Sequence, residues 1–378
     1  ARDRHLGHYL DLAAAVAPGL TGHDKRRCFE RLACERDNLR AAVEWALERR
    51  DGAAVVRLCA GLEAFWYLYG EPAELGRWLA ALLIDEQPAA VRASALGMLG
   101  YVLAFMQSDY AQGQDYYRQA VALWRELDDQ PRLTDGLARL GEIAMEQGQY
   151  ARSQRWYAEA LDLRRLSGDR EGVVGLQDCV GLVLLRQGDF AAARAVFAEN
   201  LRWWQRRNNS RAIAFALNAL GMIALYEHRW DEAERLAGQA LEVWRGSGDT
   251  RGVSSALNAL GPALLRQGRV EQARACLRES LLLRWEFHDY DGIAWNLERL
   301  AEVALADDQT ARAARLWGRA AELREELGIP LFPAERLRLA PLIARAMARL
   351  APDEWSGRWA EGGAAALAEV VAGEIGDR

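Results

Sequence analysis

Apolar residues recur at helical spacing along nearly the whole chain, in runs of about 18 residues separated by short polar breaks. One run, 170–187, places five apolar side chains on one helical face: Val173, Leu176, Val180, Val183 and Leu184. The next run, 190–207, has a second such face: Ala193, Val196, Phe197 and Leu201. Because a glycine and an aspartate stand between the runs, we predict two helices joined by a tight turn.

This two-helix pattern repeats along the chain. A small residue marks the same place in successive units: Gly100, Gly141, Gly181, Gly221, Gly261 and Ala301. A fixed period of about 40 residues indicates stacked copies of one supersecondary unit, each touching only its neighbours. We therefore predict an all-α protein, an α-α superhelix with six helical hairpins over 95–327.

The flanks are helical but do not keep the period. Before the repeats, residues 1–94 form a helical N-terminal segment with helices predicted at 3–16, 25–49, 53–69 and 73–84, and 53–86 has the length of a degenerate repeat. After the repeats, IPLFP at 329–333 predicts a turn. Helices at 334–349 and 353–375 then predict a helical cap over 328–378.

Composition excludes several function classes. A formal net charge of −6 argues against a nucleic-acid partner, which selects a basic surface. The five cysteines include no CxxC pair, so neither a disulfide framework nor a zinc site is expected. His5 and His8 lack the further ligands of a metal site. With no run of eighteen apolar residues and no signal peptide, we expect no membrane partner and a cytoplasmic location.

Catalysis is not expected from this chain. Its one lysine, Lys25, lacks the glycine-rich approach and the following Ser or Thr of a phosphate loop, so no nucleotide cofactor is predicted here. No nucleophile elbow or other catalytic cluster is apparent. The chain also begins without methionine, and we expect it to be a fragment of a longer protein.

The repeat unit resembles a tetratricopeptide (TPR) repeat over about 95–325. The resemblance is carried by small–large alternation at Leu140-Gly141, Leu220-Gly221 and Leu260-Gly261 and by Ala233, Ala240 and Ala273. Small residues suit positions where helix backbones approach closely. The resemblance implies a right-handed superhelix in which the first helix of each hairpin forms the inner wall.

Motifs on both flanks carry a wider resemblance. They read ERDNLRAA at 35–42, WAL at 45–47, FW at 65–66, GRWL at 76–79, ARLWGRAAE at 314–322, REELGIPL at 324–331 and WAEG at 359–362. Together they resemble the C-terminal sensor of bacterial STAND regulators, signal-transducing ATPases that include LuxR-type and AfsR-like transcriptional regulators. The resemblance implies ATP or ADP binding only in an upstream ATPase, followed by a winged helix, and an inducer bound by the repeats.

One inner-wall position repeats every 40 residues and defines the candidate site: Asp178, Asn218, Asn258 and Glu298. On the same helical faces lie Phe215, Met222 and Trp295, with Arg139 and Glu142 in an earlier unit. Asparagine can bind a peptide backbone amide through both a donor and an acceptor, and the two carboxylates would favour a cationic group. Alternatively, these polar residues bridge neighbouring helices.

The favoured hypothesis is a sensor module that binds an inducer (small molecule, peptide or protein) in its groove and controls its own upstream ATPase and winged-helix domains. A free-standing peptide receptor or protein–protein scaffold is the alternative, and an enzyme is the third. An upstream phosphate loop in the same reading frame would separate the first two.

Overall fold

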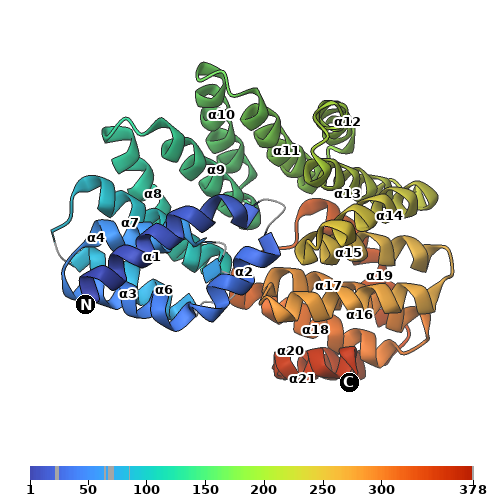
Figure 1. The fold of residues 1–378 in the computed structure, drawn as a ribbon. Coiled ribbons are helices and arrows are strands. Elements are labelled where there is room, and N and C mark those ends of the chain that lie inside the picture. The colour runs from blue at the N-terminus through green and yellow to red at the C-terminus, as the bar shows by residue number, and fades with distance from the viewer. Residues whose placement is uncertain (22–24, 64, 67–71, 85, 377–378) are drawn as a thin grey trace. The chain divides into compact units, whose positions relative to one another are not determined.

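The computed structural model describes residues 1–378 except 22–24, 64, 67–71, 85 and 377–378. Throughout the described residues the regular structure is helical, as predicted (Figure 1). The helices form two compact units, 1–143 and 144–378, and the division falls inside one helix, α9. The predicted division into 1–94, 95–327 and 328–378 follows sequence repeats rather than compactness and stays a prediction.

Unit 1 is built from the N-terminal helices and the first helices of the repeat series. They are α1 (Arg2–Val16), η1 (Ala17–Thr21), α2 (Lys25–Cys34), α3 (Arg36–Glu48), α4 (Gly52–Gly61), α6 (Pro72–Ile84), α7 (Ala89–Tyr101), η2 (Val102–Met106), α8 (Tyr110–Glu126) and α9 (Gln130–Glu146). The single helix predicted at 25–49 is wrong, because the helix breaks at Glu35, whose carboxylate accepts hydrogen bonds from Tyr9 and Asn38. Helix α4 ends earlier than the predicted 53–69, and positions 64 and 67–69 lie outside the described residues.

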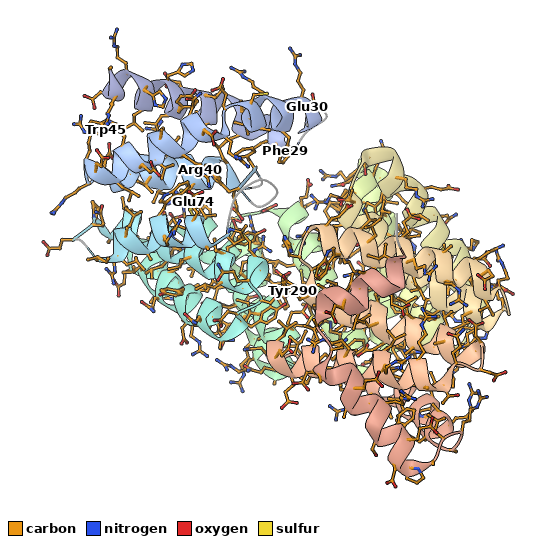
Figure 2. The ribbon with its side chains drawn as sticks, turned by 90° about the horizontal axis from the view of Figure 1, so that it is seen from below. Phe29, Glu30, Arg40, Trp45, Glu74 and Tyr290 are labelled. Atoms are coloured by element: carbon orange, nitrogen blue, oxygen red, sulfur yellow. The ribbon has the colours of Figure 1, made fainter. Side chains whose placement is uncertain are left out.

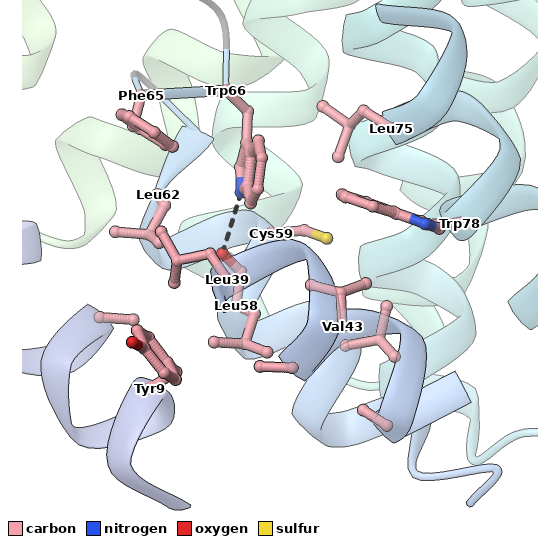
Figure 3. Packing of buried hydrophobic residues seen from close by; sticks show 14 of the residues in the cluster. Tyr9, Leu39, Val43, Leu58, Cys59, Leu62, Phe65, Trp66, Leu75 and Trp78 are labelled. Carbon is pink, nitrogen blue, oxygen red and sulfur yellow. Dashed lines mark hydrogen bonds between the residues drawn. The ribbon is translucent and has the colours of Figure 1, made fainter. Parts of the chain in front are cut away.

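A tryptophan-rich core holds unit 1 together (Figure 3). The rings of Trp66 and Trp78 meet edge to face with centroids 5.4 Å apart. The indole N–H of Trp66 donates to the Leu58 carbonyl at 3.3 Å, so this buried donor is satisfied. At the surface of the same unit, Arg40 of α3 donates to Glu74 of α6 at 2.7 Å (Figure 2).

One described stretch, Ala89–Met106, is long and apolar enough to cross a membrane by length and composition. It comprises α7 and the π-helical turn η2, and half of it is buried inside unit 1. Because this stretch packs against α6 and α8, we assign it to the core of the unit.

Unit 2 contains the regular hairpins. Its helices after α9 are α10 (Tyr150–Leu166), α11 (Arg170–Gln187), α12 (Phe190–Arg207), α13 (Ser210–Tyr226), α14 (Trp230–Ser247), α15 (Thr250–Arg266), α16 (Val270–Glu286), α17 (Tyr290–Ala306), α18 (Thr310–Leu327), α19 (Pro333–Met347), α20 (Pro352–Ala364) and α21 (Leu367–Ile375) (Figure 1). The helices predicted at 170–187 and 190–207 are confirmed at both ends.

In the hairpins of unit 2 a residue with left-handed backbone precedes each N-cap, and where the N-cap is Asp or Asn its side chain caps the next helix. Gly188 has φ +90° and the following Asp189 accepts the backbone N–H of Ala192. Left-handed backbone costs glycine little, and a capping side chain satisfies one of the four free N–H groups of the next helix. The same pair occurs at Gly168-Asp169, Asn208-Asn209, Gly248-Asp249 and His288-Asp289.

The first helices of the hairpins face one another along unit 2. Helices α13, α15 and α17 approach each other more closely than the second helices α14, α16 and α18 do. The repeated glycines allow the two helices of a hairpin to pack closely. A Cβ on Gly181 would lie 2.8 Å from the Phe197 ring, and one on Gly261 would lie 2.7 Å from Leu277. We call the surface formed by α11, α13, α15 and α17 the inner wall.

The C-terminal helices divide between two places in unit 2. Helix α19 packs against α11 of the inner wall, whereas α20 packs along α18. The single helix predicted at 353–375 is wrong, because Ala365 has extended backbone (φ −68°, ψ 142°) and separates α20 from α21.

Candidate functional site

The chain's own segment 329–335 lies across the inner wall of unit 2. Phe332 is 3% exposed, and its ring centroid lies 6.2 Å from that of Tyr226 in α13 and 5.1 Å from that of Trp295 in α17. The guanidinium of Arg186 in α11 sits over the same ring, 5.7 Å from its centroid. One aromatic side chain therefore contacts three of the four wall helices, in geometries typical of favourable aromatic and cation–π contacts.

A buried charge cluster anchors the next turn of this segment. Glu335, the third residue of α19, is 1% exposed and accepts the Tyr226 hydroxyl at 2.7 Å. It also accepts from Arg299 of α17 at 3.2 Å and from Arg338 at 2.5 Å. Burial by itself raises the pKa of Glu335, but Arg299 and Arg338 hold that pKa well below its ordinary value. The carboxylate is therefore ionised and fixes α19 to the wall.

The predicted carboxylates at the ends of the repeat series are bonded within their own hairpins. Asp178 accepts from Asn200 at 2.8 Å and from Trp204 at 3.0 Å, both on α12. Glu298 accepts from Arg324 of α18 at 2.7 Å. Burial raises the pKa of Asp178 and of Glu298, and these partners oppose the shift. In this structure both carboxylates therefore bridge helices.

The two asparagines between them are less fully bonded. Asn218 donates to Ser255 of the next first helix at 3.1 Å, and the buried Oδ1 atoms of Asn218 and Asn258 have no hydrogen-bond partner. A cavity of about 40 Å³ is lined by Asn258, Met222 and Trp295, so three predicted site residues come together there. That volume suits a water molecule rather than an inducer.

The other predicted residues divide between the units. Phe215 packs in the same apolar cluster as Met222, Trp295 and Phe332. Arg139 and Glu142 belong to unit 1, where they form an ion pair of 2.9 Å. The Arg139 guanidinium also lies over the Tyr101 and Phe105 rings, 5.6 and 5.4 Å from their centroids.

An open pocket of about 510 Å³ lies between α19 and the hairpins of α11 to α15. This volume is in the range of small-molecule sites. Its lining is mainly apolar and consists of Gln187, Gly188, Phe190, Leu225, Tyr226, His228, Trp230, Pro262, Arg266, Ala334, Leu337, Arg338, Pro341 and Leu342. Leu337 is 78% exposed at the pocket, so its side chain is available to a bound molecule.

Sequence reasoning missed most of the residues that form this pocket. Tyr226 and Arg266 stand at or near the ends of first helices, outside the repeat position that the pattern singled out, and Arg338 comes from the C-terminal cap. The sequence did contain one signal that the cap folds back on the wall: Phe332, an aromatic residue in a turn between Pro330 and Pro333. Among the described residues no three His, Cys, Asp or Glu side chains gather as metal ligands.

Comparison with protein families gives a match over most of the chain. The model of the MalT-like TPR region matches residues 79–347. An HTH-type transcriptional regulator of Mycobacterium tuberculosis is 28% identical over 147 residues, which are 36% of this chain and 17% of that protein, and one of Mycobacterium bovis matches equally well. The matched part thus spans about a sixth of the length of these relatives.

Solved structures share the fold. A Rap protein complexed with competence and sporulation factor has a TM-score of 0.58 and 15% identity, over 96% of this chain and 99% of that one. NprR in complex with its cognate peptide NprX has a TM-score of 0.56 and 14% identity, over 95% of this chain and 98% of that one. A STAND protein with a tetratricopeptide repeat sensor from Pyrococcus horikoshii has a TM-score of 0.53 and 12% identity, over 94% of this chain and 55% of that one. At these identities the likeness concerns the fold alone.

Proposed function

Because this chain belongs to the MalT-like TPR region family, matched over residues 79–347, we propose that it is the inducer-sensing part of a longer signalling regulator. The inducer binds in the 510 Å³ pocket beside α19. ATP or ADP binding and DNA binding reside in other parts of that regulator, and this chain performs no catalysis. The observation that carries the proposal is the open apolar pocket on the inner wall, where TPR-type repeats commonly hold their partners.

The anchoring of α19 gives binding a way to act on the rest of the protein. Helix α19 supplies one side of the pocket through Ala334, Leu337 and Arg338, and it is fixed to three wall helices through Phe332 and Glu335. If α19 can occupy two positions on the wall, an inducer that binds one of them more tightly shifts the population toward that position. The predicted residues Asn218, Asn258, Met222 and Trp295 would then sense the change beneath Phe332.

The test uses Leu337→Glu, which places a charge at the mouth of the pocket without disturbing the buried core. Leu166→Glu is the matched control, since Leu166 is 85% exposed and does not line the pocket. In a thermal-shift screen of metabolites, inducers should raise the melting temperature of the wild type and the control but not of Leu337→Glu. An inducer that stabilises all three proteins equally would place its site elsewhere.

A peptide receptor is the second candidate, because the wall already holds a peptide segment of its own chain. The solved NprR complex contains its cognate peptide, which supports the same reading for this fold. A synthetic peptide with the sequence of 329–338 should stabilise the Phe332→Ala variant, whose wall lacks its aromatic anchor, more than the wild type. No stabilisation of either protein would remove this candidate.

A further inference from the structure

One of the arginines that line the pocket beside α19 is paired with a carboxylate that also pairs with two other arginines. Arg266, the last residue of α15, donates to Glu302 at 3.1 Å. The same carboxylate lies 2.6 Å from Arg338 and 3.3 Å from Arg299. The Arg266 side chain is 32% exposed and lines the pocket, whereas that of Glu302 is 3% exposed and lies behind it. The pocket therefore presents the arginine and hides the carboxylate.

Positive charge is in surplus around this arginine. Three guanidinium groups (Arg266, Arg299 and Arg338) share the two carboxylates Glu302 and Glu335. The neighbouring Glu298 is paired with Arg324, which also lies 3.4 Å from Asp291, so this group adds no positive charge to the three arginines. Burial lowers the pKa of Arg266, Glu302 opposes this, and Arg338, Arg299 and Arg345 lower the pKa further. An added anion would relieve this uncompensated charge.

The rest of the pocket is suited to a flat apolar body. The rings of Phe190 and Tyr226 stack in parallel, with centroids 5.4 Å apart and an interplanar angle of 5°. The Tyr226 hydroxyl already donates a hydrogen bond to Glu335, so a molecule in the pocket would contact mainly the Tyr226 ring. Trp230, Leu225 and Pro262 complete the apolar lining of the pocket that Arg266 also lines.

From this arrangement we propose that the pocket binds an amphipathic anion, an aromatic or otherwise apolar body carrying one carboxylate or sulfonate. The anionic group pairs with Arg266, and the apolar body lies against Phe190, Tyr226 and Trp230. A cation is repelled by the arginines, and a neutral molecule leaves the surplus charge unpaired. This inference rests on the proposed function and specifies the ligand chemistry of the same site.

The test compares two fluorescent probes that share their ring system. 8-Anilinonaphthalene-1-sulfonate carries a sulfonate, and N-phenyl-1-naphthylamine is its neutral counterpart. With the full chain, the sulfonate probe should bind saturably at one site and roughly 10-fold more tightly than the neutral probe, as expected for a charge-assisted contact. Arg266→Gln should abolish that difference by weakening only the sulfonate probe, whereas Arg266→Lys should retain most of it.

Controls separate a folding defect from a lost contact. Arg211→Gln removes an arginine that is 83% exposed and does not line the pocket, and it should bind both probes like the wild type. Near-ultraviolet circular dichroism should show that each variant keeps its native packing, because loosely folded chains also bind the sulfonate probe.

The possible failures are distinguishable. Equal affinity of the two probes for the wild type, with binding lost in Leu337→Glu, would overturn the preference for an anion and leave the pocket as a binding site. The same conclusion would follow if Arg266→Gln weakened both probes equally. Absence of saturable binding by either probe, or binding unaffected by Leu337→Glu, would overturn the site itself and with it the proposed function.

Discussion

Two carboxylates on the inner wall of unit 2 accept hydrogen bonds from partners 26 positions later, on the second helix of the same hairpin. Trp204 donates to Asp178, and Arg324 donates to Glu298. Both carboxylates therefore have donors supplied by the 40-residue repeat itself. The buried ion pair of Glu298 and Arg324 also fixes the helix register, and removing either partner leaves a buried charge, at a cost of about 3–5 kcal/mol.

The carboxyl group of Asp291 gives a prediction about how the stability of the protein depends on pH. Burial raises its pKa to about 6, helped by Glu146 and opposed by Arg324 and Arg186. In an unfolded chain an aspartate has a pKa of about 3.9, so between pH 4 and 6 the folded state binds more protons. The contribution of Asp291 to stability therefore falls as pH rises through this window, and its penalty is complete above about pH 6.

Asp291→Asn should remove that fall. Its free energy of unfolding should decline less than that of the wild type between pH 4 and 6.5, by about 1–3 kcal/mol. Urea denaturation at half-unit pH intervals measures the difference. Parallel pH profiles for the two proteins would contradict the prediction.

At the scale of helices, α18 and α20 touch through glycines at two places. A Cβ on Gly318 would lie 2.2 Å from the Trp359 carbonyl oxygen, and one on Gly362 would lie 2.0 Å from that of Arg315. Both obstacles are backbone atoms, so neither can move without shifting a helix. The glycines in the flanking motifs WGR and WAEG thus set how closely the cap packs on the last repeat.

Gly362→Ala should therefore destabilise unit 2 by about 1–3 kcal/mol, the usual cost of overpacking. Gly357→Ala is the matched control in the same helix, because a Cβ there meets nothing within 4 Å. The control should be neutral or slightly stabilising, since alanine favours a helix over glycine by about 1 kcal/mol. Chemical denaturation compares the two, and equal stabilities would argue against the close approach of α18 and α20.

At the scale of the whole molecule, each unit has its own core, and unit 2 also covers its inner wall and its last repeat. Segment 329–335 covers Tyr226 and Trp295, while α20 brings Trp355 against Trp317 with ring centroids 6.4 Å apart. A stack of repeats needs such a terminal cover, because its last helix otherwise exposes an apolar face.

Ending the chain after Gly328 should show what this cover contributes. The truncated protein should melt at a lower temperature than the full chain and self-associate at micromolar concentration, because Tyr226, Trp295 and Trp317 lose their covering side chains. Scanning calorimetry and sedimentation velocity measure these effects. A monomeric truncated chain with an unchanged melting temperature would show that α19 to α21 do not protect the repeats.

The sequence by itself determined the helices, the repeat and the hairpin turns of this protein. These depend on neighbouring residues: apolar spacing defines each helix, and pairs such as Gly188-Asp189 end one helix and begin the next. The breaks at Glu35 and Ala365 were missed because each lies inside a favourable helical pattern. Of the predicted site residues, Met222, Asn258 and Trp295 come together around a cavity of about 40 Å³, and their role in binding stays a prediction.

Only the tertiary structure decided what covers the inner wall and where space remains on it. Phe332 lies 106 positions after Tyr226 in sequence, and no periodic pattern links the two, yet their rings pack together. The pairing of Glu335 with Arg299, and the exposure of Arg266 beside a shared carboxylate, likewise depend on how α19 folds back. Such contacts are set by long-range packing, whereas helices are set by local spacing.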